Sequence, residues 1–150
     1  MRYSLMGCLW LWGLAAMAAE PVSTGWLDDT AIGGRDTVAY HRLQPDDAAV
    51  AGNKTYVTRW KDADWYFASE AEQRAFAENP EHYAPAYNGF CANALSLGEG
   101  LVKTNGRHWA VLDNQLFLFY SARGAERWLN NDYRAYKKHA DRAWQEILHP

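Results

Sequence analysis

The sequence predicts an α+β domain in which a small antiparallel sheet, built from two β-hairpins, packs with several short helices and a C-terminal amphipathic helix. Three observations predict this class. Two pairs of aromatic-rich segments are each joined by a short polar turn, a helix-capping serine follows each pair, and an apolar pattern with three- and four-residue steps closes the chain. With 150 residues the chain has the length of about one domain.

The first part of the chain predicts an extended arm, a short strand and a hairpin. Residues 19–32 show no clear period and form the arm, which we expect Trp26 and Leu27 to pin to the domain. Residues 38–43 are apolar enough for a short strand. Residues 54–67 predict a hairpin, because strands at 54–60 and 65–67 flank a polar turn.

Capping residues place the helices that follow. Ser69 and Glu72 form a capping box, so a helix should begin there, run to about Asn79 and bury Ala71, Ala75 and Phe76. Pro80 suits the first position of another short helix. Residues 90–97 predict a further helix that stops at Gly98.

The last third predicts a second hairpin and two helices. Strands at 107–112 and 115–120 flank Asp113 and Asn114, a pair suited to a two-residue turn. Ser121 caps a helix that ends near Leu129. The final helix is amphipathic, with its apolar face formed by Tyr133, Tyr136, Ala140, Trp144 and Ile147.

Residues 1–18 have the pattern of a secretory signal peptide. Arg2 precedes an uncharged apolar run at 5–17, and small residues end at Ala18, where we expect cleavage. The run is too short for a membrane span. The predicted mature protein is periplasmic or secreted, has no membrane attachment, and consists of the arm (19–32) and the domain (33–148).

The charge balance and the cysteine content exclude several classes of function. Cleavage would remove Arg2 and Cys8, leaving 14 Lys and Arg side chains against 18 Asp and Glu, with no basic run. This balance argues against binding to nucleic acid or anionic lipid. Cys91 would be the one cysteine left, so a disulfide within the mature chain is excluded.

Cys91 is the residue with the most distinctive expected chemistry. It follows the turn at 88–90 and should lie in the first turn of a helix, where unpaired amides and the helix dipole favour a thiolate. Aromatic side chains of Tyr83, Tyr87 and Phe90 could wall a pocket above it. Three interpretations stay open: a soft-metal ligand, a nucleophile, or a small buried apolar side chain.

Further metal ligands would have to come from histidine or tyrosine. His41, His82 and His108 are the candidates, but no two have the helical spacing of a zinc site and no second cysteine lies near Cys91. His41 is preferred because the predicted strand would place it beside Tyr40. The sequence carries no nucleophile elbow, phosphate loop or dinucleotide fingerprint, which favours a non-enzymatic protein.

Four segments together resemble a known family. Residues 33–41, 65–69, 76–92 and 109–120 are similar to the exported, stand-alone YHS-domain proteins of bacteria, and the resemblance covers about 33–148. It implies a small α+β domain with a role in handling metal. Metal-linked YHS modules usually contain several cysteines, whereas only Cys91 and His41 fall where ligands are expected here.

These observations predict a non-enzymatic periplasmic domain that binds copper or zinc. Cys91 would be the main ligand, with His41 and a tyrosine, Tyr40 or Tyr87, completing an open site. A protein partner or a second copy of the chain could supply what is missing. Two alternatives remain: a thiol redox or transfer protein with Cys91 as nucleophile, and a purely structural or protein-interaction domain.

Overall fold

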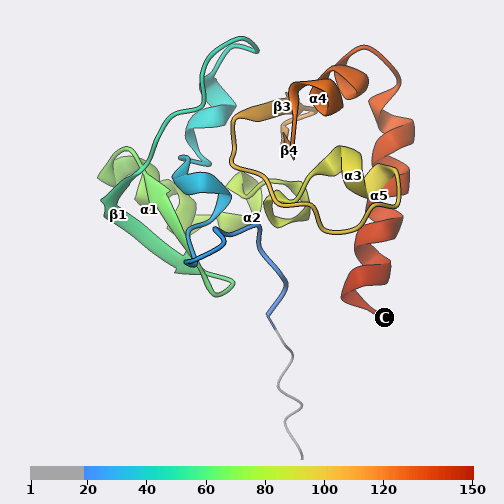
Figure 1. The fold of residues 1–150 in the computed structure, drawn as a ribbon. Helices are drawn as coiled ribbons and strands as arrows, with labels where there is room; N and C mark the ends of the chain where they lie inside the picture. Colours follow the sequence, from blue (N-terminus) through green and yellow to red (C-terminus); the bar gives the residue numbers. More distant parts are fainter. Residues whose placement is uncertain (1–18) are drawn as a thin grey trace, which may run out of the picture.

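The computed structural model describes residues 19–150, so the predicted signal peptide lies outside the described residues. Within them the chain forms two antiparallel sheets of two strands each, with several helices that include a long one at the C-terminus. The α+β prediction is therefore confirmed. Figure 1 shows the second hairpin, β3–β4, between the first hairpin, β1–β2, and the C-terminal helix, α5.

The first hairpin pairs β1 (Asn53–Trp60) with β2 (Ala63–Phe67). Its turn consists of Lys61 and Asp62, which both have positive φ angles, of 50° and 57°. Two left-handed residues define the turn type whose twist matches that of the flanking strands. The turn is thus two residues shorter than predicted, and β2 begins earlier.

The second hairpin pairs β3 (His108–Leu112) with β4 (Gln115–Phe119). Asp113 and Asn114 form its turn, with φ angles of 48° and 61°. Aspartate and asparagine tolerate this conformation better than most residues. The two-residue turn predicted for this position is confirmed.

Helix α1 (Glu70–Glu78) begins as the capping box predicts, since the Ser69 hydroxyl accepts the N–H of Glu72. Of the predicted buried face, Phe76 is buried and Ala75 is partly buried as expected, but Ala71 is wrong. Ala71 is exposed, whereas Glu72 is buried and its carboxylate pairs with Arg42. A charged partner from outside the helix makes burial of this glutamate tolerable.

The remaining helices are short apart from the last. They are α2 (Pro80–Tyr83), the 3₁₀ turn η3 (Ala86–Gly89), α3 (Ala92–Ser96), α4 (Ala122–Leu129) and α5 (Tyr133–Leu148). The apolar face of α5 packs inward as predicted.

The strand predicted at 38–43 is wrong, because this segment forms the 3₁₀ helix η2 (Ala39–Arg42). The cause is Asp36, a fully buried residue. Its carboxylate accepts hydrogen bonds, 2.8 to 3.2 Å long, from the main-chain N–H groups of Val38, Ala39 and Ala68. Asp36 therefore turns the chain into a helical conformation where an apolar pattern alone favours a strand.

The core consists of two apolar clusters on opposite faces of the β3–β4 hairpin. The N-terminal cluster is built around Ile32, Trp65 and Phe76, and the C-terminal cluster around Leu95 and Trp128. Side chains of β3 and β4 alternate between them. Trp109, Leu116 and Leu118 join the N-terminal cluster, and Ala110, Phe117 and Phe119 join the C-terminal cluster.

The arm belongs to the core, but not through the residues predicted to pin it. Trp26 and Leu27 are 90% and 100% exposed. The arm is held instead by buried Val22, by Ile32 at the start of η1 (Ile32–Gly34), and by Ser23, whose hydroxyl accepts the N–H of Thr104 at 2.9 Å.

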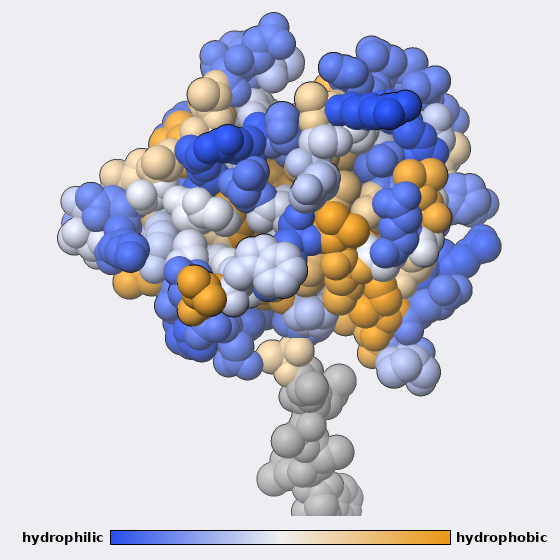
Figure 2. All heavy atoms as spheres, in the orientation of Figure 1, coloured by the Kyte–Doolittle hydropathy of each residue, from blue (hydrophilic) through white to orange (hydrophobic). Residues whose placement is uncertain are grey.

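The face drawn in Figure 2 is mostly hydrophilic, with one larger apolar stretch in front of α3 and α5. Exposed Leu97 and Leu101 belong to the connection between α3 and β3. The domain thus covers most of its large apolar side chains internally.

Candidate functional site

Cys91 lies where the sequence places it, immediately before α3, as the residue that caps this helix. Its sulfur accepts the main-chain N–H groups of Ala94, at 3.4 Å, and of Tyr120, at 3.3 Å. Its own N–H donates to the carbonyl of Val102 at 2.8 Å. Cys91 therefore ties together α3, the loop before β3 and the end of β4.

The sulfur is enclosed. Cys91 is 3% exposed and belongs to the C-terminal cluster. Both of its hydrogen-bond partners are main-chain donors. In the part of the chain that the structure describes, no group of three or more His, Cys, Asp or Glu side chains is arranged to hold a metal ion. A cation at Cys91 would have to compete with two N–H dipoles that already point at the sulfur.

Tyr87 shares the C-terminal cluster with Cys91, but its hydroxyl is directed elsewhere. It donates to the carboxylate of Asp141 on α5 at 2.8 Å. Burial raises the pKa of Tyr87 above its usual range, and the hydrogen bond to Asp141 adds to this. Metal binding by tyrosine requires the phenolate, so this environment keeps Tyr87 in the wrong form for a ligand.

Tyr40 lies in the N-terminal cluster, apart from Cys91. Its hydroxyl donates to the carbonyl of Gly106 at 2.6 Å, and its ring packs edge-on against Trp109. Burial also raises the pKa of Tyr40 above its usual range. The structure therefore does not bring the four predicted ligands, Cys91, His41, Tyr40 and Tyr87, together.

His41 meets a different partner, His82. The two imidazole rings stack with their centroids 5.5 Å apart and their planes 21° from parallel. The ring of Tyr83 stands edge-on against both, at 5.6 Å from His41 and 4.6 Å from His82. η2 and α2 thus place two imidazoles and one phenol in direct contact.

The imidazole of His41 has an unsatisfied nitrogen. Its Nε2 atom is buried and has no hydrogen-bond partner. Burial lowers the pKa of His41, and the neighbouring His82 lowers it further. His41 is therefore neutral at pH 7, the form in which imidazole binds metals.

His82 is the residue that sequence reasoning weighed but did not select. It is exposed on α2 and lies 41 positions after His41 in the chain. The spacing of the two residues carries no local signal. Their contact depends on η2, which replaces the predicted strand and turns His41 toward α2.

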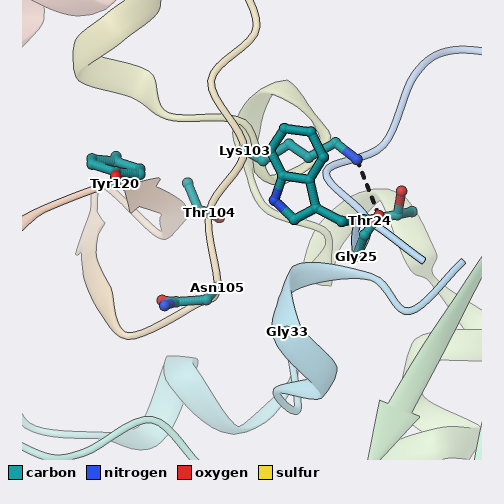
Figure 3. A pocket seen from close by; sticks show the side chains of 8 residues that line it. Thr24, Gly25, Gly33, Lys103, Thr104, Asn105 and Tyr120 are labelled. Atoms are coloured by element: carbon teal, nitrogen blue, oxygen red, sulfur yellow. Dashed lines mark hydrogen bonds between the residues drawn. The ribbon is translucent and has the colours of Figure 1, made fainter. Parts of the chain in front are cut away.

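A groove of about 240 Å³ lies between the N-terminal arm and the segment before β3 (Figure 3). Lys103 borders it, with its ammonium group donating to the carbonyl of Gly25 at 3.1 Å and standing 5.2 Å from the centre of the Trp26 ring. Tyr120, whose N–H reaches the sulfur of Cys91, also lines the groove. Cys91 itself is not among the residues that line this groove.

Fold and site together define a small α+β domain with an enclosed thiol and a partly exposed histidine pair. Comparison of the chain with protein-family models, curated proteins and solved structures finds no match. No helix within residues 19–150 is both long and apolar enough to cross a membrane.

Proposed function

We propose that the protein is a non-enzymatic binding domain for a borderline metal ion, copper(II) or zinc, and that His41 and His82 hold the ion. The observation that carries this proposal is the buried, unpartnered Nε2 atom of His41, which lies in a ring that stacks on a second imidazole. An orphaned buried polar atom requires an explanation, and an ion or water bound at the site is a common one.

The free-energy cost of the unpartnered Nε2 atom of His41 favours binding of a ligand there. A buried polar atom without a partner costs about 1–3 kcal/mol. A metal ion bound to Nε2 would remove this cost, and it would find the imidazole already neutral because burial lowers the pKa of His41. His41 therefore gives up neither a hydrogen bond nor a proton when it binds an ion.

His41 and His82 offer two ligands to the ion, and water would occupy its remaining coordination positions. Copper(II) and zinc accept imidazole nitrogen, and copper(II) binds such sites more tightly than zinc does. Zinc–nitrogen bonds measure about 2.0–2.1 Å, so the stacked rings must tilt before both reach one ion. His82 is exposed and can make this movement, while His41 stays packed against Tyr83. We expect an exchangeable ion rather than a permanent structural one.

The test is a calorimetric titration of the chelator-treated protein with zinc and with copper(II). His82→Ala should weaken binding at least tenfold, because it removes one of two ligands without disturbing a buried residue. His139→Ala is the matched control, since His139 is exposed on α5. Cys91→Ser should bind as the parent does. Equal binding by the parent and by His82→Ala would refute the histidine site.

A second candidate function is thiol chemistry at Cys91. It is favoured by the place of the sulfur immediately before α3, where it accepts the main-chain N–H groups of Ala94 and Tyr120. In this function the sulfur would attack a disulfide of a partner, form a mixed disulfide and release the other sulfur as a thiolate. Rapid alkylation of native Cys91 by iodoacetamide at pH 7, as measured by mass spectrometry, is the result it requires. Alkylation only after unfolding would exclude it and leave Cys91 with a structural role.

We include in this proposal that the protein is exported and belongs with the stand-alone YHS-domain proteins. The support is the sequence likeness at 33–41 and 76–92 and the signal-like pattern of residues 1–18. Mass spectrometry of the protein from its native cell fraction tests export, with a mature chain that begins at Ala19 as the expected result.

A further inference from the structure

A hollow of about 520 Å³ lies beside the first hairpin, next to the groove of Figure 3, with which it shares Gly25 and Gly33. Two cationic side chains, Arg35 and Lys54, line it. Thr30 and Tyr66 also line it, and the Thr30 hydroxyl donates to the Tyr66 hydroxyl at 3.5 Å. The hollow thus combines two positive charges with one hydroxyl group, that of Tyr66, that is left to donate to a ligand.

Neither cation has a counter-ion within residues 19–150, since every ion pair described there involves other basic residues. Arg35 makes one long hydrogen bond, 3.4 Å from its Nη1 to the carbonyl of Ala49. Its Nε atom is buried without a partner. A guanidinium N–H that is buried without an acceptor carries a free-energy cost, which a bound acceptor would remove.

The one carboxylate at the hollow does not serve as that partner. Asp28 lines the hollow, but its Oδ1 atom accepts the N–H of Thr30 at 3.0 Å and closes a local turn. Asp28 forms no ion pair with Arg35 or Lys54 in the described chain. The cations therefore retain their donors for a ligand.

Two glycines that line the hollow lie in close contact with neighbouring backbone. Gly33 has a φ of 67°, and a Cβ atom there would come within 2.5 Å of the carbonyl oxygen of Asn105. Gly52 lies against the main chain of Tyr66, where a Cβ atom would approach the carbonyl to 2.5 Å. Glycine is therefore required at both positions. These close approaches fix the backbone of two residues that line the hollow.

We propose that this hollow binds an anion of the phosphate class, with Arg35 and Lys54 neutralising its charge and the Tyr66 hydroxyl donating to one of its oxygens. A guanidinium group presents its N–H groups in a fork that matches phosphate oxygens, and a lysine adds a mobile point charge. The volume exceeds that of an inorganic phosphate ion and falls within the range of small-molecule sites. The same chemistry suits free phosphate and a phosphomonoester.

The test is calorimetry at low ionic strength with two probes, inorganic phosphate and glycerol 3-phosphate. Lys54→Gln should weaken the binding of either probe at least fivefold. Arg35→Lys should weaken it about tenfold, because the charge stays and the fork is lost, while the stem that packs near Gly106 is kept. Lys138→Gln, which removes an exposed lysine on α5, is the matched control and should bind as the parent does.

The two probes separate the sources of the phosphate group. Tighter binding of glycerol 3-phosphate identifies an organic phosphate as the ligand class, and equal binding identifies the free ion. Failure of the parent protein to bind either probe would overturn the proposal, as would unchanged affinity in both Lys54→Gln and Arg35→Lys. Circular dichroism of each variant confirms that a loss of binding is not a loss of fold.

Discussion

The surroundings of Cys91 and of His41 differ in one respect that matters for function. The sulfur of Cys91 is enclosed and receives two main-chain N–H groups, so its hydrogen-bonding capacity is used within the fold. The Nε2 atom of His41 is buried as well, but nothing in the described chain satisfies it. A buried polar group that makes its hydrogen bonds within the fold stabilises the structure. A buried polar group without a partner is the place where a ligand can add a favourable interaction. The one cysteine of residues 19–150 is therefore not the residue that most needs a partner.

The largest expected effect is on stability at Cys91. Cys91→Ala should lower the free energy of unfolding by about 2–4 kcal/mol, because it leaves two buried N–H groups without an acceptor and opens a small cavity. Cys91→Ser should lose less, since its hydroxyl can still accept. Urea unfolding measures both. A loss below 0.5 kcal/mol in Cys91→Ala would contradict the structural role of the sulfur.

A comparable effect is expected at His41, but only in the presence of metal. Zinc at 100 times its dissociation constant should add about 2.7 kcal/mol to the stability of the parent protein. His41→Phe should gain nothing from zinc. Without metal this variant should be as stable as the parent or more stable, because phenylalanine fills the space and removes the orphaned nitrogen. Thermal unfolding with and without zinc checks this, and a zinc-induced shift retained in His41→Phe would place the ion elsewhere.

The smallest effect is the pH dependence of the metal-free protein. The folded-state pKa of His41 is lowered by burial and by His82 from an ordinary value of about 6.5. The unfolded chain therefore takes up this proton at a higher pH than the folded chain does. Stability from this group is complete above about pH 6.5 and is lost as the pH falls toward the lowered pKa.

The difference between the parent and His41→Phe isolates this contribution. The charged or titratable groups next to His41 are His82, Tyr83 and Arg42, which pairs with Glu72, and all of them remain in the variant. Urea unfolding at pH 7.5 and at pH 5.5 should therefore show a smaller decrease for His41→Phe than for the parent. An equal decrease would mean that His41 is not held neutral by its surroundings.

Much of the fold was predictable from interactions between residues that are close in the sequence. Asp113 and Asn114 form the expected turn, and Ser69 caps α1 as its pairing with Glu72 indicates. These features depend on neighbours within a few residues. η2 was not predictable, because Asp36 bends the chain with the help of Ala68, 32 positions away. The error mattered, since a strand at 38–43 would place His41 beside Tyr40 and away from α2.

The candidate sites were also predictable only as far as they depend on residues close in the sequence. The turn before Cys91 was enough to predict that a helix starts there. The hydrogen bond from the Tyr120 N–H and the enclosure of the sulfur were not predictable, because they depend on β4 and the C-terminal cluster. The contact between His41 and His82 and the hollow beside Arg35 arise from segments distant in sequence. Residue types thus suggested which chemistry to look for, and tertiary packing decided which residues are free to perform it.

The most direct measurement is X-ray absorption spectroscopy of the zinc-loaded protein at the zinc edge. Zinc–nitrogen and zinc–oxygen bonds lie near 2.0–2.2 Å, whereas a zinc–sulfur bond lies near 2.3 Å. The histidine site predicts light ligands only, with the outer-shell scattering of about two imidazole rings, and loss of that scattering in His82→Ala. A sulfur ligand near 2.3 Å that disappears in Cys91→Ser would return the metal to Cys91 and contradict the account.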